Sequence, residues 1–143
     1  MDRKAEARWM GDLKNGNGKV HLGSGAFDGP YSFNSRFANG TGTNPEELLG
    51  AAHAGCYSMA LAAALAGAGH AATSITTTAT VHLTQDTTGF SISGIDLVTR
   101  GVVPGISPDA FKKFAEDTKK TCIVSRALAS VPMTLDASVV SSA

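Results

Sequence analysis

The two cysteines of the 143-residue sequence, Cys56 and Cys122, are the side chains with the widest chemical range. A thiolate is a nucleophile, a metal ligand and a redox centre, whereas a buried thiol also serves as a small apolar side chain. The N-terminal residues 1–4 are charged apart from Met1 and no apolar signal segment follows, so we expect a cytoplasmic location. In that compartment structural disulfides are disfavoured, and two cysteines indicate reactivity, a metal or packing.

A thiol that reacts as a thiolate needs a nearby cation, because a free cysteine has a pKa of about 8.5. Cys56 lies in a segment without formal charge, residues 48–70, so the cation must come from elsewhere. Arg36 is an attractive source, because its guanidinium cannot lose its proton and can hold a thiolate and a carboxylate together. The alternative for Arg36 is a surface arginine at the end of a strand.

Glu46 and Glu47 are the candidate acidic partners of Arg36. On a helix, Glu46 lies about 80° around the axis from Cys56, whereas Glu47 lies on the opposite face. Glu46 therefore suits the active site and Glu47 suits the helix cap. Glu46 and Cys56 are also roughly 15 Å apart along a continuous helix. Either the helix breaks near Gly50, or an antiparallel partner helix supplies its own glutamate and arginine to this thiol.

Cys122 follows two lysines and a threonine at an expected helix N-terminus, where unpaired N–H groups favour an anionic sulfur. His53 precedes Cys56 by three residues, so the two could bind a metal, but the other histidines lie on separate segments and give no four-ligand spacing. We expect no metal, and interpret His53 as a buried histidine that donates to a backbone carbonyl, with the option of tuning the thiol from nearby.

Cys56 is positioned by the segment Gly42–Gly69, which we predict to be a long central helix. Its start carries residues typical of helix N-termini: Asn44 as the cap, then Pro45, Glu46 and Glu47. The run is long enough to raise the question of a membrane span, which needs about 20 apolar residues. Alanine and glycine dominate it, His53 lies inside it, and no basic cluster flanks it, so we predict a soluble core helix and no membrane.

Alternating apolar residues predict strands on both sides of the helix. We expect a hairpin around residues 15–18, a third strand marked by Tyr31 and Phe33, two long strands after Gly69 with a bulge near Gly94, and a last strand over 133–139. Ser107 and Pro108 open a second helix, and a short helix from residue 121 or 122 to 128 follows. The fold class is α+β, in a single domain over residues 1–143.

Twelve basic and twelve acidic residues balance, so nothing indicates a nucleic-acid partner. A domain of this size cannot easily cover so apolar a helix on all sides. We therefore expect an intimate, intertwined homodimer, with a second subunit on part of the helix.

The stretch RFANGTGTNPEELLGAAHAGCYSMAL, together with the later KTCIVSRAL, resembles the osmotically inducible protein C family of thiol peroxidases. The resemblance covers nearly the whole chain and is greater to the branch of that name than to the organic-hydroperoxide-resistance branch. It implies three-stranded β elements at each end around a long central helix, in a homodimer. It also implies a two-cysteine peroxidase that reduces organic hydroperoxides, and hydrogen peroxide less efficiently, with no cofactor and with a small dithiol reductant, such as a lipoyl type.

Carried over by motif, the resemblance implies that Cys56 is the peroxidatic thiol and Cys122 the resolving thiol. Arg36 matches the arginine that activates the thiol, and a glutamate of the PEE triplet matches its acidic partner. Ile123 departs from the family, which usually has proline at that position. The substrate pocket is less defined, and the candidate lining residues, for which plain core is the alternative, are Phe37, Tyr57, Met59 and Ile123.

Two functions of other classes remain open at this point. One is a non-catalytic module that binds a small ligand in an apolar pocket between subunits. The other is a redox sensor, in which a disulfide changes a partner surface without peroxide detoxification.

Overall fold

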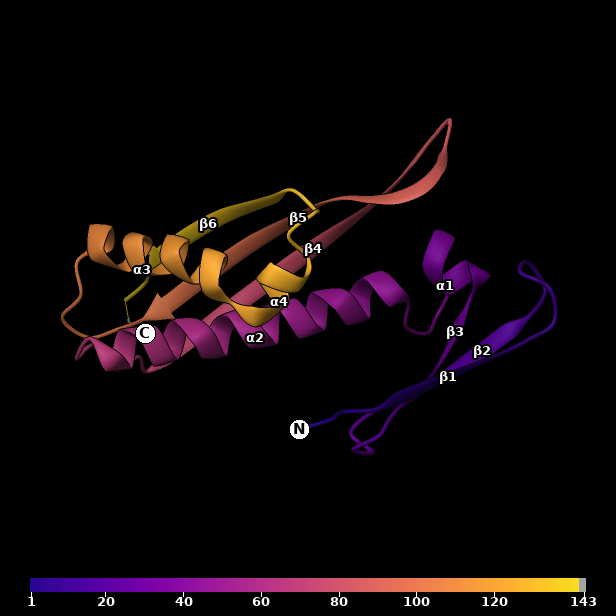
Figure 1. Cartoon of the computed structure of the whole chain (residues 1–143), viewed down its shortest axis with the longest axis horizontal. Coiled ribbons are helices and arrows are strands. Elements are labelled where there is room, and N and C mark those ends of the chain that lie inside the picture. The colour runs from indigo at the N-terminus through magenta and orange to yellow at the C-terminus, as the bar shows by residue number, and fades with distance from the viewer. Residues whose placement is uncertain (142–143) are drawn as a thin grey trace. The chain divides into compact units, whose positions relative to one another are not determined.

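The computed structural model describes residues 1–141 and contains two compact units, Met1–Leu48 and Leu49–Ala143. The elements, labelled in Figure 1, are β1 (Ala5–Met10), β2 (Asn17–Leu22), β3 (Asp28–Ser32), α1 (Phe33–Phe37), α2 (Pro45–Gly67), β4 (Ser74–Asp86), β5 (Gly89–Val102), α3 (Pro108–Thr121), α4 (Ile123–Ala127) and β6 (Met133–Val139). The α+β class, the three early and three late strands and the long helix are as predicted. The single domain over 1–143 stays a prediction.

The first unit is built on an antiparallel meander in the order β1-β2-β3. Trp9 on β1 and Tyr31 on β3 both pair with Gly18 on β2 between them. Their rings lie 5.3 Å apart across that glycine. A Cβ at position 18 would come within 2.3 Å of the Tyr31 ring and 2.8 Å of the Trp9 ring. Glycine is therefore required for the two aromatic side chains to meet over the middle strand.

The expectation that Phe33 belongs to the third strand is wrong, because the chain turns into the short helix α1 at this residue. Ser32 is its N-cap, and Ser32 and Ser35 form a reciprocal capping box. The side chains of Ser32 and Ser35 accept hydrogen bonds from backbone N–H groups at the start of the helix. These local hydrogen bonds favour a helix over the strand that the alternating aromatic residues indicate. Arg36 consequently lies on a helix and not at a strand end.

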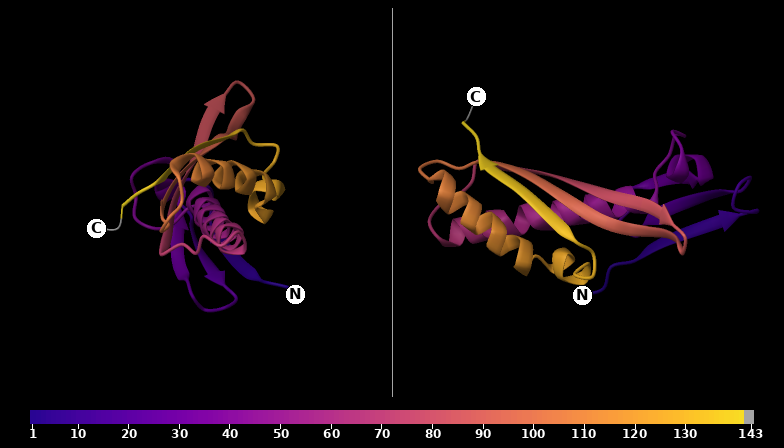
Figure 2. Two further views of the ribbon diagram at one scale, coloured as in Figure 1. Left: turned by 90° about the vertical axis from the view of Figure 1, so that its left-hand side faces the viewer. Right: turned by 90° about the horizontal axis from the view of Figure 1, so that it is seen from above.

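The second unit contains a sheet in the order β4-β5-β6, with β4 and β5 antiparallel and β5 and β6 parallel. The predicted bulge near Gly94 is confirmed, since the register shifts between His82 and Leu83, which pair with Gly94 and Ile92. The extra residue on β5 changes which side chains face the helices beyond the bulge. In Figures 1 and 2, α2, α3 and α4 lie on one face of this sheet.

The core of the second unit lies between these helices and the sheet. Its fully buried side chains of largest volume include Tyr57, Leu61 and Leu65 of α2, Ile95 and Leu97 of β5, and Phe111 of α3. By length and apolar composition alone, with a mean hydropathy of 1.4, α2 would also be long enough to cross a membrane. Here it is the core helix of the second unit, as predicted.

Candidate active site

The sulfur atoms of Cys56 and Cys122 lie 3.3 Å apart, although the residues are separated by 66 positions. Cys56 is half-buried on α2, and Cys122 is 1% exposed at the junction of α3 and α4. Both thiols are free. A disulfide requires an S–S distance of about 2.05 Å, so the sulfurs need to approach by only about 1 Å to bond. The two cysteines therefore form a pair that can be oxidised without rearrangement of the unit.

Cys122 is the N-cap of α4, as its sequence position indicates. Burial acts to raise the pKa of its thiol, but the backbone N–H of Ser125, the Cys56 thiol, the Ser125 hydroxyl and the Val124 N–H together outweigh burial and lower that pKa. The helix N-terminus thus favours the thiolate of Cys122.

His53 is fully buried on α2, one turn before Cys56. Its Nε2 lies 2.7 Å from the hydroxyl oxygen of Ser125 on α4. The predicted hydrogen bond from His53 to a backbone carbonyl is therefore wrong, because a side-chain hydroxyl takes the place of the carbonyl. Burial lowers the pKa of His53 below its ordinary value of 6.5, so the ring is neutral at neutral pH. Within residues 1–141, no cluster of three or more histidine, cysteine or acidic side chains could hold a metal ion.

Arg36 and Glu46 form an ion pair within the first unit. The Arg36 Nη2 donates to Glu46 Oε1 at 2.7 Å, and Nε donates to the two carboxylate oxygens at 3.3 and 3.2 Å. Glu46 is 8% exposed, whereas the Arg36 side chain keeps 37% of its surface exposed. The carboxylate fixes the guanidinium from one side and leaves part of it open to another group.

Hydrogen bonds between α1 and the residues before α2 position this ion pair. The Ser35 hydroxyl donates to the carbonyl of Thr43 at 2.7 Å, and the Asn44 side chain donates to the carbonyl of Ser35 at 3.1 Å. Thr43 also forms a bridge with Tyr31 of β3. These contacts hold the first turn of α2 against α1, so that residues 36 and 46 meet.

Glu47 has a different environment from Glu46. Its backbone N–H donates to the side chain of Asn44 at 2.8 Å, which is the N-cap contact expected of Asn44. The Glu47 carboxylate accepts from the Thr43 hydroxyl at 2.7 Å. Arg36 thus pairs with Glu46, while Glu47 belongs to the start of the helix.

An apolar pocket of about 420 Å³ lies beside Arg36 in the first unit. Its aromatic lining consists of Trp9, Tyr31, Phe33 and Phe37, and we call it the aromatic pocket. The Arg36 guanidinium lies 5.2 Å from the centre of the Phe37 ring, so the cation stands over an aromatic face. The pocket combines apolar walls with one positive group.

The remaining candidates for a substrate pocket lie in the second unit. Tyr57 is fully buried in the core, where its hydroxyl donates to the carbonyl of Ala115 at 2.8 Å. Met59 on α2 and Ile123 on α4 are exposed, at 76% and 75%.

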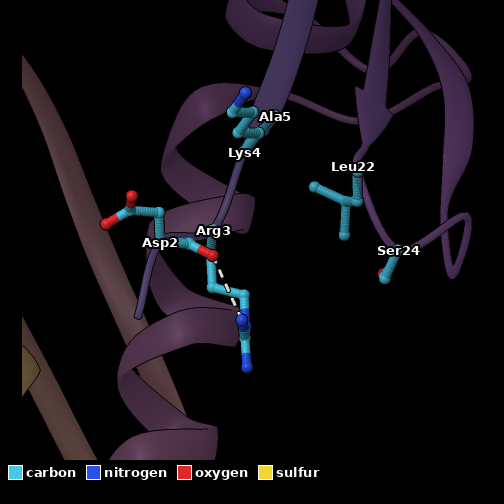
Figure 3. Close-up of a pocket in the computed structure, with 7 residues that line it drawn as sticks. Asp2, Arg3, Lys4, Ala5, Leu22 and Ser24 are labelled. Carbon is cyan, nitrogen blue, oxygen red and sulfur yellow. Dashed lines mark hydrogen bonds between the residues drawn. The ribbon is translucent and has the colours of Figure 1, made fainter.

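A larger depression, of about 860 Å³, lies in the first unit between the N-terminal residues 2–5 and residues 22–24. Figure 3 shows Arg3 turned back to the carbonyl of Asp2, with Leu22 and Ser24 across the opening. Neither cysteine lines it, so it offers no group for thiol chemistry.

Comparison with known proteins identifies the family of this chain. The family model described as OsmC-like protein matches residues 38–136, which include both cysteines and Glu46. The chain belongs to the OsmC-like protein family. The peroxiredoxin OsmC of Escherichia coli (strain K12) is 46% identical over 137 residues, which are 95% of each chain. The Shigella flexneri protein of the same name gives the same values.

Solved structures of OsmC-like and related proteins share the fold. The organic hydroperoxide resistance protein OhrB of Bacillus subtilis superposes with a TM-score of 0.74 at 24% identity, over 94% of this chain and 97% of that one. An organic hydroperoxide resistance protein of Elizabethkingia anophelis gives 0.74 at 22%, over 97% and 96%. The identities show that the fold persists while most side chains of this OsmC-like chain differ.

Sequence reasoning missed Ser125 and three walls of the aromatic pocket. The spacing of Cys122 and Ser125, which is that of an N-cap and the third helical residue, was a usable signal for the serine. Trp9 and Tyr31 could have been placed together from the glycine that lies opposite both of them on the middle strand. The register between the strands cannot be predicted without the turn geometry, so this pairing was not predicted.

His53 carries a prediction for the pH dependence of stability. Because burial disfavours the charged ring, the unfolded chain binds the proton more tightly than the folded one. The free energy of unfolding should therefore fall as pH is lowered from about 6.5 through the folded-state pKa. His53→Gln should flatten this decline in urea unfolding series measured at several pH values. An unchanged pH dependence in His53→Gln would contradict a neutral buried His53.

Proposed function

We propose that this OsmC-like protein is a thiol-dependent peroxidase that reduces organic hydroperoxides, and hydrogen peroxide more weakly, through the two cysteines. The observation that carries the proposal is the 3.3 Å separation of the Cys56 and Cys122 sulfurs. Metal binding needs further ligands, and a packing role does not need two sulfurs in contact. The printed name of the relatives at 46% identity, peroxiredoxin, supports the same reaction class.

In the first step, the Cys56 thiolate attacks the terminal oxygen of the hydroperoxide. The S–O bond forms as the O–O bond breaks, the alkoxide takes a proton from solvent and leaves as the alcohol, and Cys56 becomes a sulfenic acid. Cys56 suits this role because it is the more accessible sulfur. The Cys122 thiolate then attacks the Cys56 sulfur, the S–S bond forms as the S–O bond breaks, and the departing hydroxide takes a proton from solvent to leave as water. An external dithiol restores both thiols by exchange.

Arg36 and Glu46 are proposed to activate Cys56. A guanidinium fixed by a buried carboxylate can stabilise the thiolate and the charge that develops on the leaving oxygen. Since α2 is continuous from Pro45 to Gly67, the alternative of a helix break near Gly50 is not found. We therefore propose a homodimer in which each active site lies at the subunit interface and receives Arg36 and Glu46 from the partner. The exposed apolar residues of α2, such as Gly55, Met59 and Ala63, support such an interface.

The aromatic pocket beside Arg36 is the proposed site for the organic group of the hydroperoxide, with Phe37 as a wall. Tyr57, Met59 and Ile123 remain proposed contributors from the side of the thiol. Apolar walls would favour an alkyl or aryl hydroperoxide over hydrogen peroxide, because burial of the organic group adds binding energy that a bare peroxide lacks. We further propose a cytoplasmic location and a small, lipoyl-type dithiol as the reductant.

Steady-state turnover tests the function. With excess dithiothreitol, an enzyme consumes many equivalents of cumene hydroperoxide per chain. The remaining hydroperoxide is measured with a ferrous xylenol orange assay. A redox sensor or a ligand-binding module would stop at about one equivalent. Consumption that ends at one equivalent while free dithiol remains would overturn the proposal.

A further inference from the structure

His53, Ser125 and Cys122 are buried and lie close together, and we call them the polar chain. The peroxidase reaction as described uses Cys122 but neither His53 nor Ser125. The imidazole of His53 on α2 meets the hydroxyl of Ser125 on α4 at 2.7 Å, 72 positions away in sequence. Ser125 is 4% exposed and His53 is fully buried. Ser125 is the third residue of α4, whose N-cap is Cys122, and its hydroxyl contributes to the lowered pKa of the Cys122 thiol. A core position would ordinarily hold apolar groups, so this polar chain calls for a function.

Hydrogen-bonding capacity decides the direction of the chain. The Nδ1 of His53 is buried without a partner. If Nδ1 carried the proton, a buried N–H would be left unpaired, which proteins tolerate less well than an unpaired acceptor. The proton therefore belongs on Nε2, which donates to the oxygen of Ser125. The single hydrogen of Ser125 is then free to be donated to the sulfur of Cys122.

This direction stabilises negative charge on Cys122. The N–H of a neutral imidazole withdraws charge from the hydroxyl oxygen, which strengthens the hydroxyl as a donor to a thiolate. Because burial keeps His53 neutral, the chain supplies polarisation without adding a cation to the core. Two further titratable groups face Cys122, namely the Cys56 thiol at 3.3 Å and Tyr57. The pKa of Tyr57 is raised by burial and by the negative charges of Glu116 and Cys122. Glu116 is itself paired with Lys119 at 3.2 Å.

A stabilised Cys122 thiolate matters most when the disulfide is reduced. In thiol–disulfide exchange, the sulfur with the lower pKa leaves faster. Cys122 is buried, whereas Cys56 is half-buried and is the sulfur that an external thiol can approach. We propose that His53 and Ser125 are positioning residues that stabilise Cys122 as the leaving thiolate, and so direct the reducing dithiol to Cys56. This inference rests on the proposed function.

The exchange balances as follows. A thiolate of the dithiol attacks Cys56, a new S–S bond forms, and the Cys56–Cys122 bond breaks with its electron pair on Cys122. The second thiol of the reductant then attacks its own first sulfur and releases Cys56. The reductant ends as a cyclic disulfide, and its two protons pass to the two cysteines or to solvent. His53 and Ser125 move no electrons, and act only through the charge on Cys122.

The reductive half-reaction tests this inference separately from peroxidase activity. The disulfide is formed with diamide, not with peroxide, and its reduction by dithiothreitol is followed by quenching and thiol counting. His53→Leu and Ser125→Ala should each slow reduction about tenfold, since leaving ability follows the pKa of the leaving thiol. Ser58→Ala, which removes a hydroxyl of α2 bonded to Thr77 instead, should reduce at the wild-type rate.

Two further readouts distinguish positioning from a general structural defect. In a Cys56→Ser background, the apparent pKa of Cys122 from iodoacetamide alkylation should rise in His53→Leu and Ser125→Ala. His53→Gln, whose amide can still donate to Ser125, should restore both the pKa and the reduction rate. Unchanged reduction rates and an unchanged thiol pKa in Ser125→Ala, the mildest change, would overturn the inference. A wild-type protein that is reduced as expected but fails to turn over peroxide would overturn only the proposed function.

Discussion

Replacement of Cys56 by serine is expected to abolish peroxide turnover, with a loss of about a thousandfold or more. A serine hydroxyl at neutral pH is not ionised and cannot accept oxygen to form a sulfenic acid, whereas the rest of the site remains. The measurement is the steady-state consumption of cumene hydroperoxide with excess dithiothreitol. The variant should keep its fold, because the exchange of sulfur for oxygen at this half-buried position removes little volume.

Cys122→Ser is the matched control for that experiment. It should retain the first step and accumulate a sulfenic acid on Cys56, which dimedone traps and mass spectrometry locates. Turnover should fall because no internal thiol closes the disulfide. If Cys122→Ser formed no sulfenic acid while Cys56→Ser did, the roles of nucleophile and resolving thiol would be reversed.

Arg36→Ala is the second change with a large expected effect, a fall of about a hundredfold in the rate of sulfenic acid formation. A fall of this size is typical when one preorganised hydrogen-bond donor is removed from a reacting centre. Glu46 would at the same time be left as a buried carboxylate without its cation. Arg100→Ala removes an arginine of β5 that is paired with Asp136 at 2.8 Å, and should leave the rate unchanged. An equal fall in both variants would remove Arg36 from the proposed mechanism.

Mixed dimers test whether Arg36 acts across the interface. A Cys56→Ser chain and an Arg36→Ala chain are each inactive alone. If sites are shared, a mixed dimer contains one site with an intact cysteine from one chain and an intact arginine from the other. Random mixing then returns about a quarter of the wild-type activity. If each site were formed within one chain, every mixture would stay inactive.

Much of the fold was predictable because its local signals agree with its packing. The bulge follows from the change of apolar parity at Gly94, and the N-cap of α2 from Asn44 followed by proline and two glutamates. The helix α1 was not predicted, since the aromatic residues Tyr31 and Phe33 indicate a strand, and the competing Ser32–Ser35 capping box is a short and weak pattern. Phe33–Phe37 forms a helix because the capping box is local, whereas strand pairing at so short a segment adds few hydrogen bonds.

The site was predictable in its residue types and less so in its contacts. The proximity of Cys56 and Cys122 was implied only by resemblance to the family, since no local rule brings residues 66 positions apart together. For Glu46, helical geometry indicated the face of the acidic residue, and the structure pairs it with Arg36. The bond from His53 to Ser125 depends on how α4 packs on α2, which sequence periodicity does not specify.

Mass analysis after one equivalent of hydroperoxide tests the central claim most directly. Peptide mapping without reductant should show a single intramolecular bond between Cys56 and Cys122, with the chain lighter by two hydrogens and no oxygen retained. A stable sulfinic acid on Cys56 with Cys122 still free, or a disulfide between chains in place of the internal one, would contradict the claim that the two adjacent sulfurs complete the reaction together.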